Sequence, residues 1–143
     1  MCSSDLVTTD WALDRVIEQA FPRTIRQSGR TRNDVVEITP CNSQITKGVS
    51  ENSQFWIEAA SHVISITDTD AVKTLIRSDE MKRKYNSETV MVGFNWGKGK
   101  VFHSISHFIL QKSKSGATRT EDAYSSLVLL TNILAQRKLK EVT

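Results

Sequence analysis

Two residues of this sequence have side chains suited to acid–base chemistry and stand at positions where functional sites form. Asp10 follows a short β-rich run and precedes an amphipathic stretch, and His107 stands at the end of a longer β-rich run. Sites in open α/β sheets form outside the carboxyl ends of strands. A carboxylate that orients or charge-stabilises an imidazole lets the imidazole act as a general base. Asp10 and His107 are therefore the candidate catalytic residues, and Thr9, Trp11 and Ser106 beside them complete a candidate ligand-binding set.

Each of these residues also has a simpler structural explanation. The carboxylate of Asp10 is of the type that caps the first turn of a helix. Trp11 suits a core or an interface as an aromatic residue. A hydrogen bond from His107 can anchor the polar loop Gln111–Arg119 that follows it. The sequence leaves both interpretations open at each position.

Metal, nucleotide and Ser–His chemistry are disfavoured by spacing. His103 and His107 both fall in the predicted strand Lys100–Phe108, where four residues span roughly 13 Å. That is too far for one zinc ion, whose nitrogen bonds are about 2.0–2.1 Å long. Ser106 and His107 would point to opposite faces of this strand. The stretch Gly93–Lys98 lacks the spacing of a phosphate loop, so we expect no metal and no cofactor.

Hydrophobic periodicity alternates between the spacing of strands and that of helices. The residues after Asp10 predict a helix that ends at Pro22, with Val16 on its buried face, and Thr24–Asp34 reads as a polar loop. Strands are predicted over Leu6–Thr8, Val35–Thr39, Phe55–Ile57, Val63–Ile66, Ala71–Arg77, Thr89–Asn95 and Lys100–Phe108.

The second half of the chain carries the clearest signals. Gly97 and Gly99 in a short connection predict a β-hairpin between the last two strands. A helix is expected from about Glu121 to Lys138, and its predicted buried face comprises Tyr124, Leu127, Val128, Thr131, Leu134 and Ala135. The fold class that follows is α/β: a partial flavodoxin-like sheet with a β-hairpin and a C-terminal helix packed on it.

Composition and charge limit the classes of partner that the chain is expected to bind. The 143 residues are 38% hydrophobic and 24% charged, with a net charge of +3. The basic residues are scattered and no zinc-finger or RNP-like motif accompanies them, so a nucleic-acid partner is not expected. Without a membrane-length apolar run or a signal-like start, we expect a cytoplasmic protein with no membrane partner. Cys41 has no nearby base in sequence, and we expect an inert thiol there.

The order of three short motifs resembles the class I glutamine amidotransferase-like superfamily, in its ThuA-like branch. The run Leu6-Val7-Thr8-Thr9-Asp10-Trp11 resembles the nucleophile elbow of that fold. Asn42–Val49 resembles a His-Pro-Ile loop of the branch, although Asn42 and Ser43 depart from His-Pro. Gly97–Phe102, followed by Ser106 and His107, resembles its Gly-rich hairpin and Gly-His pair.

The departures from the family pattern bear on activity. Thr9 and Asp10 stand where the family's cysteine is expected, and Phe108 and Ile109 follow His107 where its glutamate is expected. Without a thiolate, glutaminase chemistry is not expected. The resemblance also implies preceding strands that this chain lacks.

The first residues add a separate indication of truncation. Residues 1–6 match what a common sequencing adapter encodes in frame from a GTG start, although an ordinary short N-terminus is the alternative. We therefore expect a non-native start over 1–6 and a single α/β domain over 7–143, truncated at its N-terminus. A strand with an uncovered edge invites self-association.

Two functions remain open from the sequence. The favoured one is a non-catalytic ligand-binding or interaction module on a degenerate amidotransferase-like scaffold, with a small molecule or a protein as its partner. The alternative is a ThuA-like hydrolase or sugar-processing enzyme in which Asp10 orients His107. The separation of these two side chains distinguishes the functions, because acid–base cooperation requires contact directly or through one water.

Overall fold

The computed structural model describes residues 5–108 and 119–142, and the side chains among them up to residue 136. Most of the predicted non-native start, and the predicted loop Gln111–Arg119 apart from Arg119, lie outside these residues. The described part of the chain is mixed α/β, with a mixed five-stranded sheet and a C-terminal helix. This agrees with the α/β class predicted from the sequence.

The main sheet has the strand order β1-β9-β8-β7-β4. Its strands are β1 (Leu6–Thr9), β9 (Gly99–Ser104), β8 (Thr89–Trp96), β7 (Lys73–Arg77) and β4 (Thr39–Pro40). Strand β1 runs parallel to β9, whereas the other neighbours are antiparallel. Two antiparallel pairs complete the described strands: β2 (Ile25–Arg30) with β6 (His62–Ile66), and β3 (Asp34–Glu37) with β5 (Gln54–Ile57).

The predicted hairpin is confirmed. Strands β8 and β9 pair from Met91 opposite Ser104 to Trp96 opposite Gly99. Gly97 has φ of +57° in the connection, a left-handed conformation that glycine adopts without a Cβ clash. Because of this hairpin, β9 ends at the same edge of the sheet as β1.

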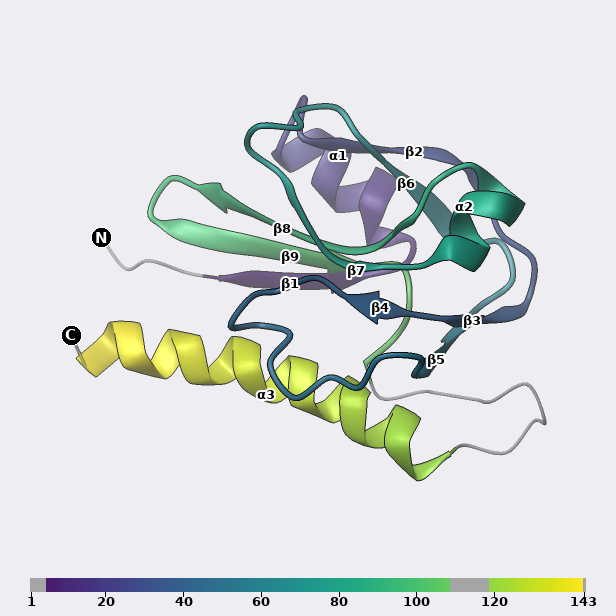
Figure 1. Ribbon diagram of the computed structural model, residues 1–143. Coiled ribbons are helices and arrows are strands. Elements are labelled where there is room, and N and C mark those ends of the chain that lie inside the picture. Colours follow the sequence, from purple (N-terminus) through teal and green to yellow (C-terminus); the bar gives the residue numbers. More distant parts are fainter. Residues whose placement is uncertain (1–4, 109–118, 143) are drawn as a thin grey trace.

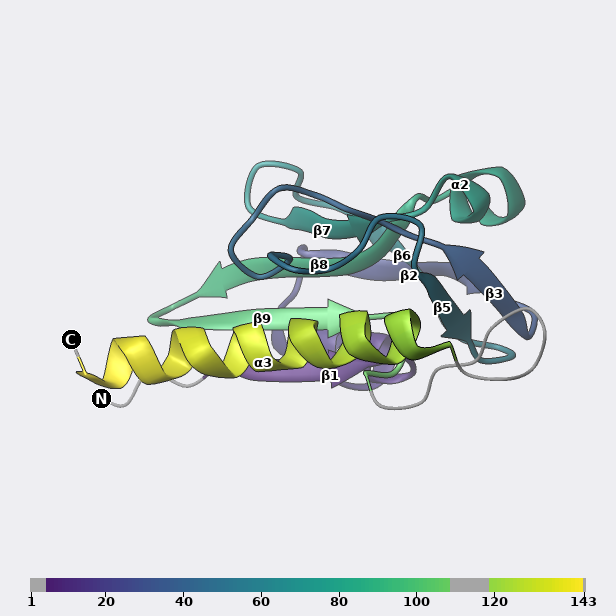
Figure 2. The same ribbon diagram turned by 60° about the horizontal axis from the view of Figure 1, so that its bottom comes forward.

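The elements form layers on both sides of the five-stranded sheet. Helix α3 (Thr120–Val142) runs along one side, and the π-helix η1 (Leu13–Ile17), the short α1 (Glu18–Ala20) and the β2–β6 pair lie on the other (Figures 1 and 2). The apolar core fills the spaces between these layers. Its fully buried side chains include Leu13, Ile17, Ile38, Ile57, Ile64, Ile76, Met81, Met91, Ile105 and Leu129.

The predicted loop Thr24–Asp34 is wrong, because it contains strand β2. Ile25 pairs with Ile66, and the pairing continues to Arg30 opposite His62. Ile25 is buried, but the other residues of the strand are partly or fully exposed. A strand with a single apolar residue lacks the alternation that reveals a half-buried strand in a sequence.

The predicted helix after Asp10 also differs from the structure. Its first regular residues form η1, which begins after Ala12, and no side chain caps it. Asp10 is therefore not the helix cap predicted from the sequence; it has φ of +52° and turns the chain between β1 and the helix. The wider π-helical turn changes the helical register, and Val16 is exposed rather than buried.

The start of helix α3 was predicted to within one residue, but the helix continues past the predicted end at Lys138 to Val142, and most of its predicted buried face is wrong. Tyr124, Leu127 and Leu134 are all more than half exposed. The inward face carries Leu129 and Ile133 together with polar side chains that satisfy backbone groups of residues 45–54. Asp122 accepts from the amide of Gln54 at 2.6 Å, Ser125 accepts from that of Ser50, and Asn132 donates to the carbonyls of Ile45 and Lys47. Residues 45–53 lie outside the strands, so their backbone groups require such donors and acceptors.

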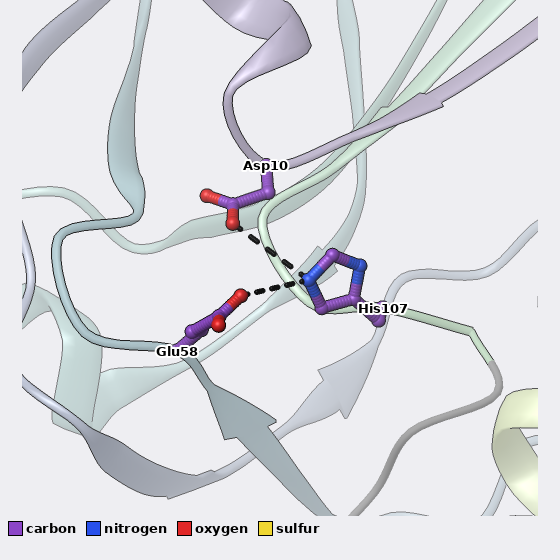
Figure 3. A group of neighbouring side chains, drawn as sticks. All are labelled: Asp10, Glu58 and His107. Atoms are coloured by element: carbon purple, nitrogen blue, oxygen red, sulfur yellow. Dashed lines mark hydrogen bonds and ion pairs between the residues drawn. The ribbon is translucent and has the colours of Figure 1, made fainter.

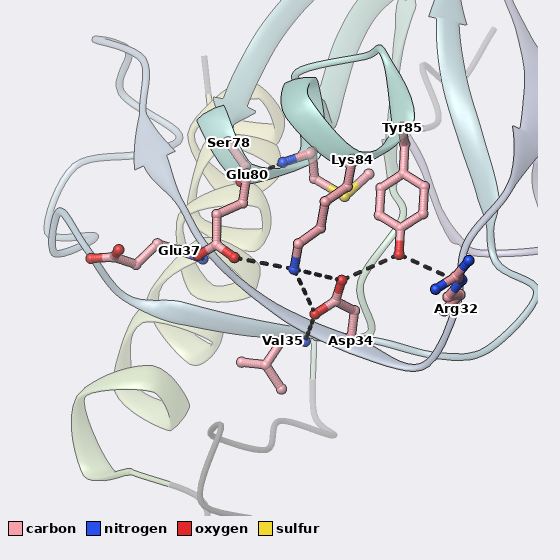
Figure 4. Close-up of polar contacts among 9 residues, drawn as sticks. Arg32, Asp34, Val35, Glu37, Ser78, Glu80, Lys84 and Tyr85 are labelled. Atoms are coloured by element: carbon pink, nitrogen blue, oxygen red, sulfur yellow. Dashed lines mark hydrogen bonds and ion pairs between the residues drawn. The ribbon is translucent and has the colours of Figure 1, made fainter.

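Helix α2 (Asp79–Tyr85) is joined to β3 by polar contacts (Figure 4). The side chain of Ser78 accepts from the Met81 amide at its start. Lys84 pairs with Asp34 at 3.0 Å and with Glu80 at 3.4 Å, and the Tyr85 hydroxyl donates to Asp34.

Among the described residues, no helix has the length and apolar character needed to cross a bilayer.

Candidate functional site

The parallel pairing of β1 with β9 places the ends of both strands side by side. Thr9, the last residue of β1, lies opposite Ser104, the last residue of β9. The amide of Asp10 donates to the Ser104 carbonyl at 2.9 Å and continues the pairing by one residue. The residues that follow the two strands therefore emerge at the same edge of the sheet.

The chain turns directly after β9, which is shorter than predicted. The strand ends at Ser104 rather than at Phe108, so His107 lies beyond it. The hydroxyl of Ser104 donates to the Ser106 carbonyl at 2.7 Å and accepts from the Ser106 amide at 3.1 Å. This local turn directs the imidazole of His107 back toward the end of β1.

A third segment reaches the same place from β5. Glu58 directly follows this strand. The Ser106 hydroxyl donates to the Trp56 carbonyl at 2.7 Å, and the Trp11 indole nitrogen donates to the Ala60 carbonyl at 3.0 Å. These two hydrogen bonds hold the end of β5 against the turns that follow β9 and β1.

Asp10, Glu58 and His107 form a carboxylate–histidine cluster (Figure 3). The His107 Nε2 atom lies 3.2 Å from the Glu58 Oε2 atom and 3.7 Å from the Asp10 Oδ2 atom. One ligand-type atom from each residue lies within 4.8 Å of the other two. Glu58 is 45% exposed at its side chain, so the cluster opens to solvent on that side.

Asp10 is the buried member of the cluster. It is only 5% exposed, and its Oδ1 atom has no hydrogen-bond partner. Burial raises the pKa of Asp10 and the Glu58 charge adds to this, whereas the imidazole of His107 opposes it. The adjacent Ser61 hydroxyl also favours the ionised form, but it is not in hydrogen-bonding geometry with either carboxylate oxygen.

Thr9 holds the other side of the His107 ring. Its Oγ1 atom lies 3.2 Å from Nδ1 of His107. When Nδ1 carries the proton, it donates to Thr9 and leaves the Nε2 lone pair facing the carboxylates. When both nitrogens are protonated, Nε2 donates to Glu58. When Nε2 alone carries the proton, it donates to Glu58 and Nδ1 accepts from the Thr9 hydroxyl, so both contacts are also made in this tautomer.

The structure divides the five residues predicted for the site into two groups. Thr9, Asp10 and His107 come together around one imidazole. Trp11 and Ser106 instead hold the surrounding backbone through their side-chain hydrogen bonds. The missed member is Glu58, and the available signal was a carboxylate directly after the short strand Phe55–Ile57.

The larger hollows described in the structure lie away from the cluster. One of about 570 Å³ is lined by residues 40–47, and one of about 520 Å³ lies between that segment and strands β7 to β9. A smaller hollow of about 190 Å³ borders Trp11, Asp14 and His62.

Burial raises the pKa of Cys41, which keeps this thiol protonated and unreactive near neutral pH.

Comparisons with known proteins bear on the fold. No family model and no curated protein matches the sequence. Among solved structures, the fold is similar to the mmIFT52 N-terminal domain, with a TM-score of 0.56 and 10% sequence identity. The similarity covers 92% of this chain and 65% of that structure, so this chain corresponds to less than two thirds of its length. At this identity, the similarity establishes a shared fold and nothing about the site.

Proposed function

We propose that this chain is a non-catalytic, cytoplasmic ligand-binding module on a flavodoxin-like, amidotransferase-like scaffold. Its ligand is cationic: an ion, a small molecule or a cationic group of a protein. The ligand binds at the carboxylate–histidine cluster of Asp10, Glu58 and His107.

One observation carries the proposal: two carboxylates converge on a single imidazole nitrogen, and no fixed positive charge of a described residue is paired with either of them. Among the described residues, neither Asp10 nor Glu58 forms an ion pair with a lysine or an arginine. Bringing two carboxylates together at a partly buried site costs free energy. A bound cation would remove this cost, and the solvent-exposed side of Glu58 gives it a path of entry.

Thermal unfolding in the presence of small cations tests the proposal. Mg²⁺, Ca²⁺, Mn²⁺, Zn²⁺, methylammonium and choline are the probes. A cation that binds the folded chain stabilises it by about 2.7 kcal/mol at a hundred times its Kd. We expect at least one probe to raise the melting temperature of the native chain, and the rise to vanish in the double variant D10N/E58Q.

The exposed Glu51 provides a matched control. The variant E51Q removes one carboxylate outside the cluster and should keep the full response. An equal response in E51Q and D10N/E58Q would show non-specific screening and would refute the proposal, as would the lack of any response.

A second candidate function is a hydrolase in which His107 is the general base. It is favoured by the 3.7 Å separation of Asp10 from His107 and by the Thr9 hydroxyl 3.2 Å from the Nδ1 atom of His107. A hydroxyl, an imidazole and a carboxylate in this sequence of contacts match the arrangement of an activated nucleophile. In this mechanism His107 accepts the Thr9 proton while Glu58 and Asp10 stabilise the imidazolium.

Hydrolysis of p-nitrophenyl acetate tests the second function. A hydrolase should lose its activity in T9V and in H107Q alike, because nucleophile and base act as a unit. Activity that survives T9V but not H107Q would indicate a base without this nucleophile. A rate equal to that of free imidazole at the same concentration would exclude the hydrolase.

A further inference from the structure

We propose that Asp10, Glu58 and His107 are the ligands of a divalent transition-metal ion of the zinc type, held in a site with at least one position open to solvent. This inference rests on the proposed function and names the class of its cation. It departs from the expectation of no metal, which considered only whether His103 and His107 share an ion.

The distances in the cluster are close to those of a coordination shell. A tetrahedral ion with bonds of about 2.1 Å separates its ligand atoms by roughly 3.4 Å. The His107 Nε2 atom is 3.2 Å from Glu58 Oε2 and 3.7 Å from Asp10 Oδ2. All three ligand atoms lie within 4.8 Å of one another. An ion therefore requires only small side-chain shifts, because each ligand comes from a different backbone segment that is already in place (Figure 3).

A second observation points independently to a ligand. The carboxylate of Asp10 is 5% exposed and points its Oδ2 atom toward His107, while its Oδ1 atom has no partner. Buried carboxylate oxygens are normally satisfied by hydrogen bonds. The Oδ2 atom has only the 3.7 Å contact with His107 among the contacts described, which is longer than a hydrogen bond, and an ion bound by Oδ2 would neutralise the charge that Asp10 and Glu58 share.

Thr9 supplies the outer contact that metal-binding histidines require. Its Oγ1 atom lies 3.2 Å from Nδ1 of His107 and can accept a proton from that nitrogen. When Thr9 accepts from Nδ1–H, the ring is in the tautomer whose Nε2 atom can bind an ion. Nε2 is the atom that faces both carboxylates.

The donor set indicates which ions are favoured. One imidazole nitrogen with two carboxylate oxygens suits Zn²⁺, Co²⁺, Fe²⁺ or Mn²⁺, whereas Mg²⁺ and Ca²⁺ prefer oxygen donors alone. Three protein ligands leave a fourth tetrahedral position for water or an external ligand. Glu58 is the most exposed of the three side chains, so this position faces solvent on its side.

Titration of the whole metal-free chain with Zn²⁺, followed by calorimetry, tests the inference. Co²⁺ gives a parallel readout through its visible absorption, which reports the coordination geometry. We expect one saturable site, with affinity more than about a hundredfold weaker in H107Q and E58Q, because even outer contacts of metal ligands are worth 10–100-fold. T9V should weaken binding about tenfold or more. Affinity should fall as the pH is lowered, because protons compete for the ligands.

E51Q is the control and should bind Zn²⁺ like the native chain. E58Q alters a side chain that is 45% exposed, so a folding defect should not confound it; circular dichroism in EDTA verifies this. Equal Zn²⁺ affinity in the native chain, H107Q and E58Q would refute the metal site. Binding of Ca²⁺ or methylammonium through Asp10 and Glu58 in a chain that does not bind Zn²⁺ would also refute the metal site, yet would leave the proposed cation-binding function intact. If no cation binds, both proposals fail.

Discussion

His103 and His107 are four residues apart, and each contacts a threonine of β1, yet their surroundings are opposite. His103 lies inside β9, is fully buried, and has its Nδ1 atom 2.8 Å from the Thr8 hydroxyl. His107 lies beyond the strand, is 29% exposed at its side chain, and faces two carboxylates. Burial lowers the pKa of His103 to about 3, and the nearby His62 acts in the same direction.

The comparison shows how the end of a strand separates a structural histidine from a candidate functional one. Within the sheet, His103 is held neutral by its apolar surroundings, and its Nε2 atom has no partner. Past the end of the strand, the turns after β1, β5 and β9 bring charged side chains to His107. A histidine in contact with a threonine hydroxyl thus serves packing at position 103 and polar chemistry at position 107.

The largest predicted difference between the two histidines is in stability. H103A should lower the free energy of unfolding by about 3 kcal/mol, because it opens a cavity in the fully buried core and leaves Thr8 without its partner. H107A should lower it by less than about 1 kcal/mol, because its side chain is partly exposed. Urea unfolding of both variants measures the difference. Equal losses would contradict the distinction drawn between the two positions.

The pH dependence of stability should come largely from His103. Its pKa is about 3 in the folded chain and about 6.5 when unfolded, so the unfolded chain binds the extra proton between these values. The stabilisation is therefore present above pH 6.5 and is lost by up to about 1.4 kcal/mol for each pH unit below it. Urea unfolding from pH 7 to pH 4.5 measures the slope. The H103Q variant should lose this contribution, whereas H107Q should keep it.

The two threonines provide a third test. T8V removes the hydroxyl that contacts the fully buried imidazole of His103, and it should lower the free energy of unfolding by about 1–2 kcal/mol. T9V should cost less than about 0.5 kcal/mol, because His107 can bond to water instead. The effects on Zn²⁺ affinity should be reversed, with a loss in T9V and little change in T8V. If T9V proves more destabilising than T8V, the assignment of His103 as the structural member is wrong.

Much of this arrangement could be predicted from local sequence patterns. The β8–β9 hairpin follows from glycines between β-rich runs, and the proximity of Asp10 to His107 follows from their places at the ends of β-rich runs, although the predicted strand extended too far and included His107. These features depend on short-range periodicity and on a general rule for sheet edges.

The missed features depend on long-range packing. Strand β2 has one apolar residue facing the core, and α3 presents polar side chains inward because segment 45–54 needs partners. Glu58 joins the cluster only because the Ser106 and Trp11 side chains hold the end of β5 in place. Neither kind of contact leaves a periodic signal in the sequence.

The remaining prediction concerns the effect of Asp10 on stability, and the sign of this effect should depend on metal. Because the pKa of Asp10 is raised, the folded chain holds its proton more tightly than the unfolded chain above about pH 3.8. The ionised carboxylate therefore destabilises the metal-free fold as the pH rises through the folded pKa. In EDTA at pH 7, D10N should gain about 0.5–1 kcal/mol in urea unfolding, and this gain should shrink toward pH 4.

With saturating Zn²⁺, the same substitution should become destabilising, because it removes a ligand that only the folded state can offer. A buried carboxylate kept merely for packing would show no such reversal. If D10N has the same effect with and without Zn²⁺, Asp10 is not a metal ligand. The sign of the change that D10N makes in the free energy of unfolding, with and without Zn²⁺, therefore distinguishes two cases. Asp10 is either an unpaired buried charge or a charge that a bound metal ion pairs.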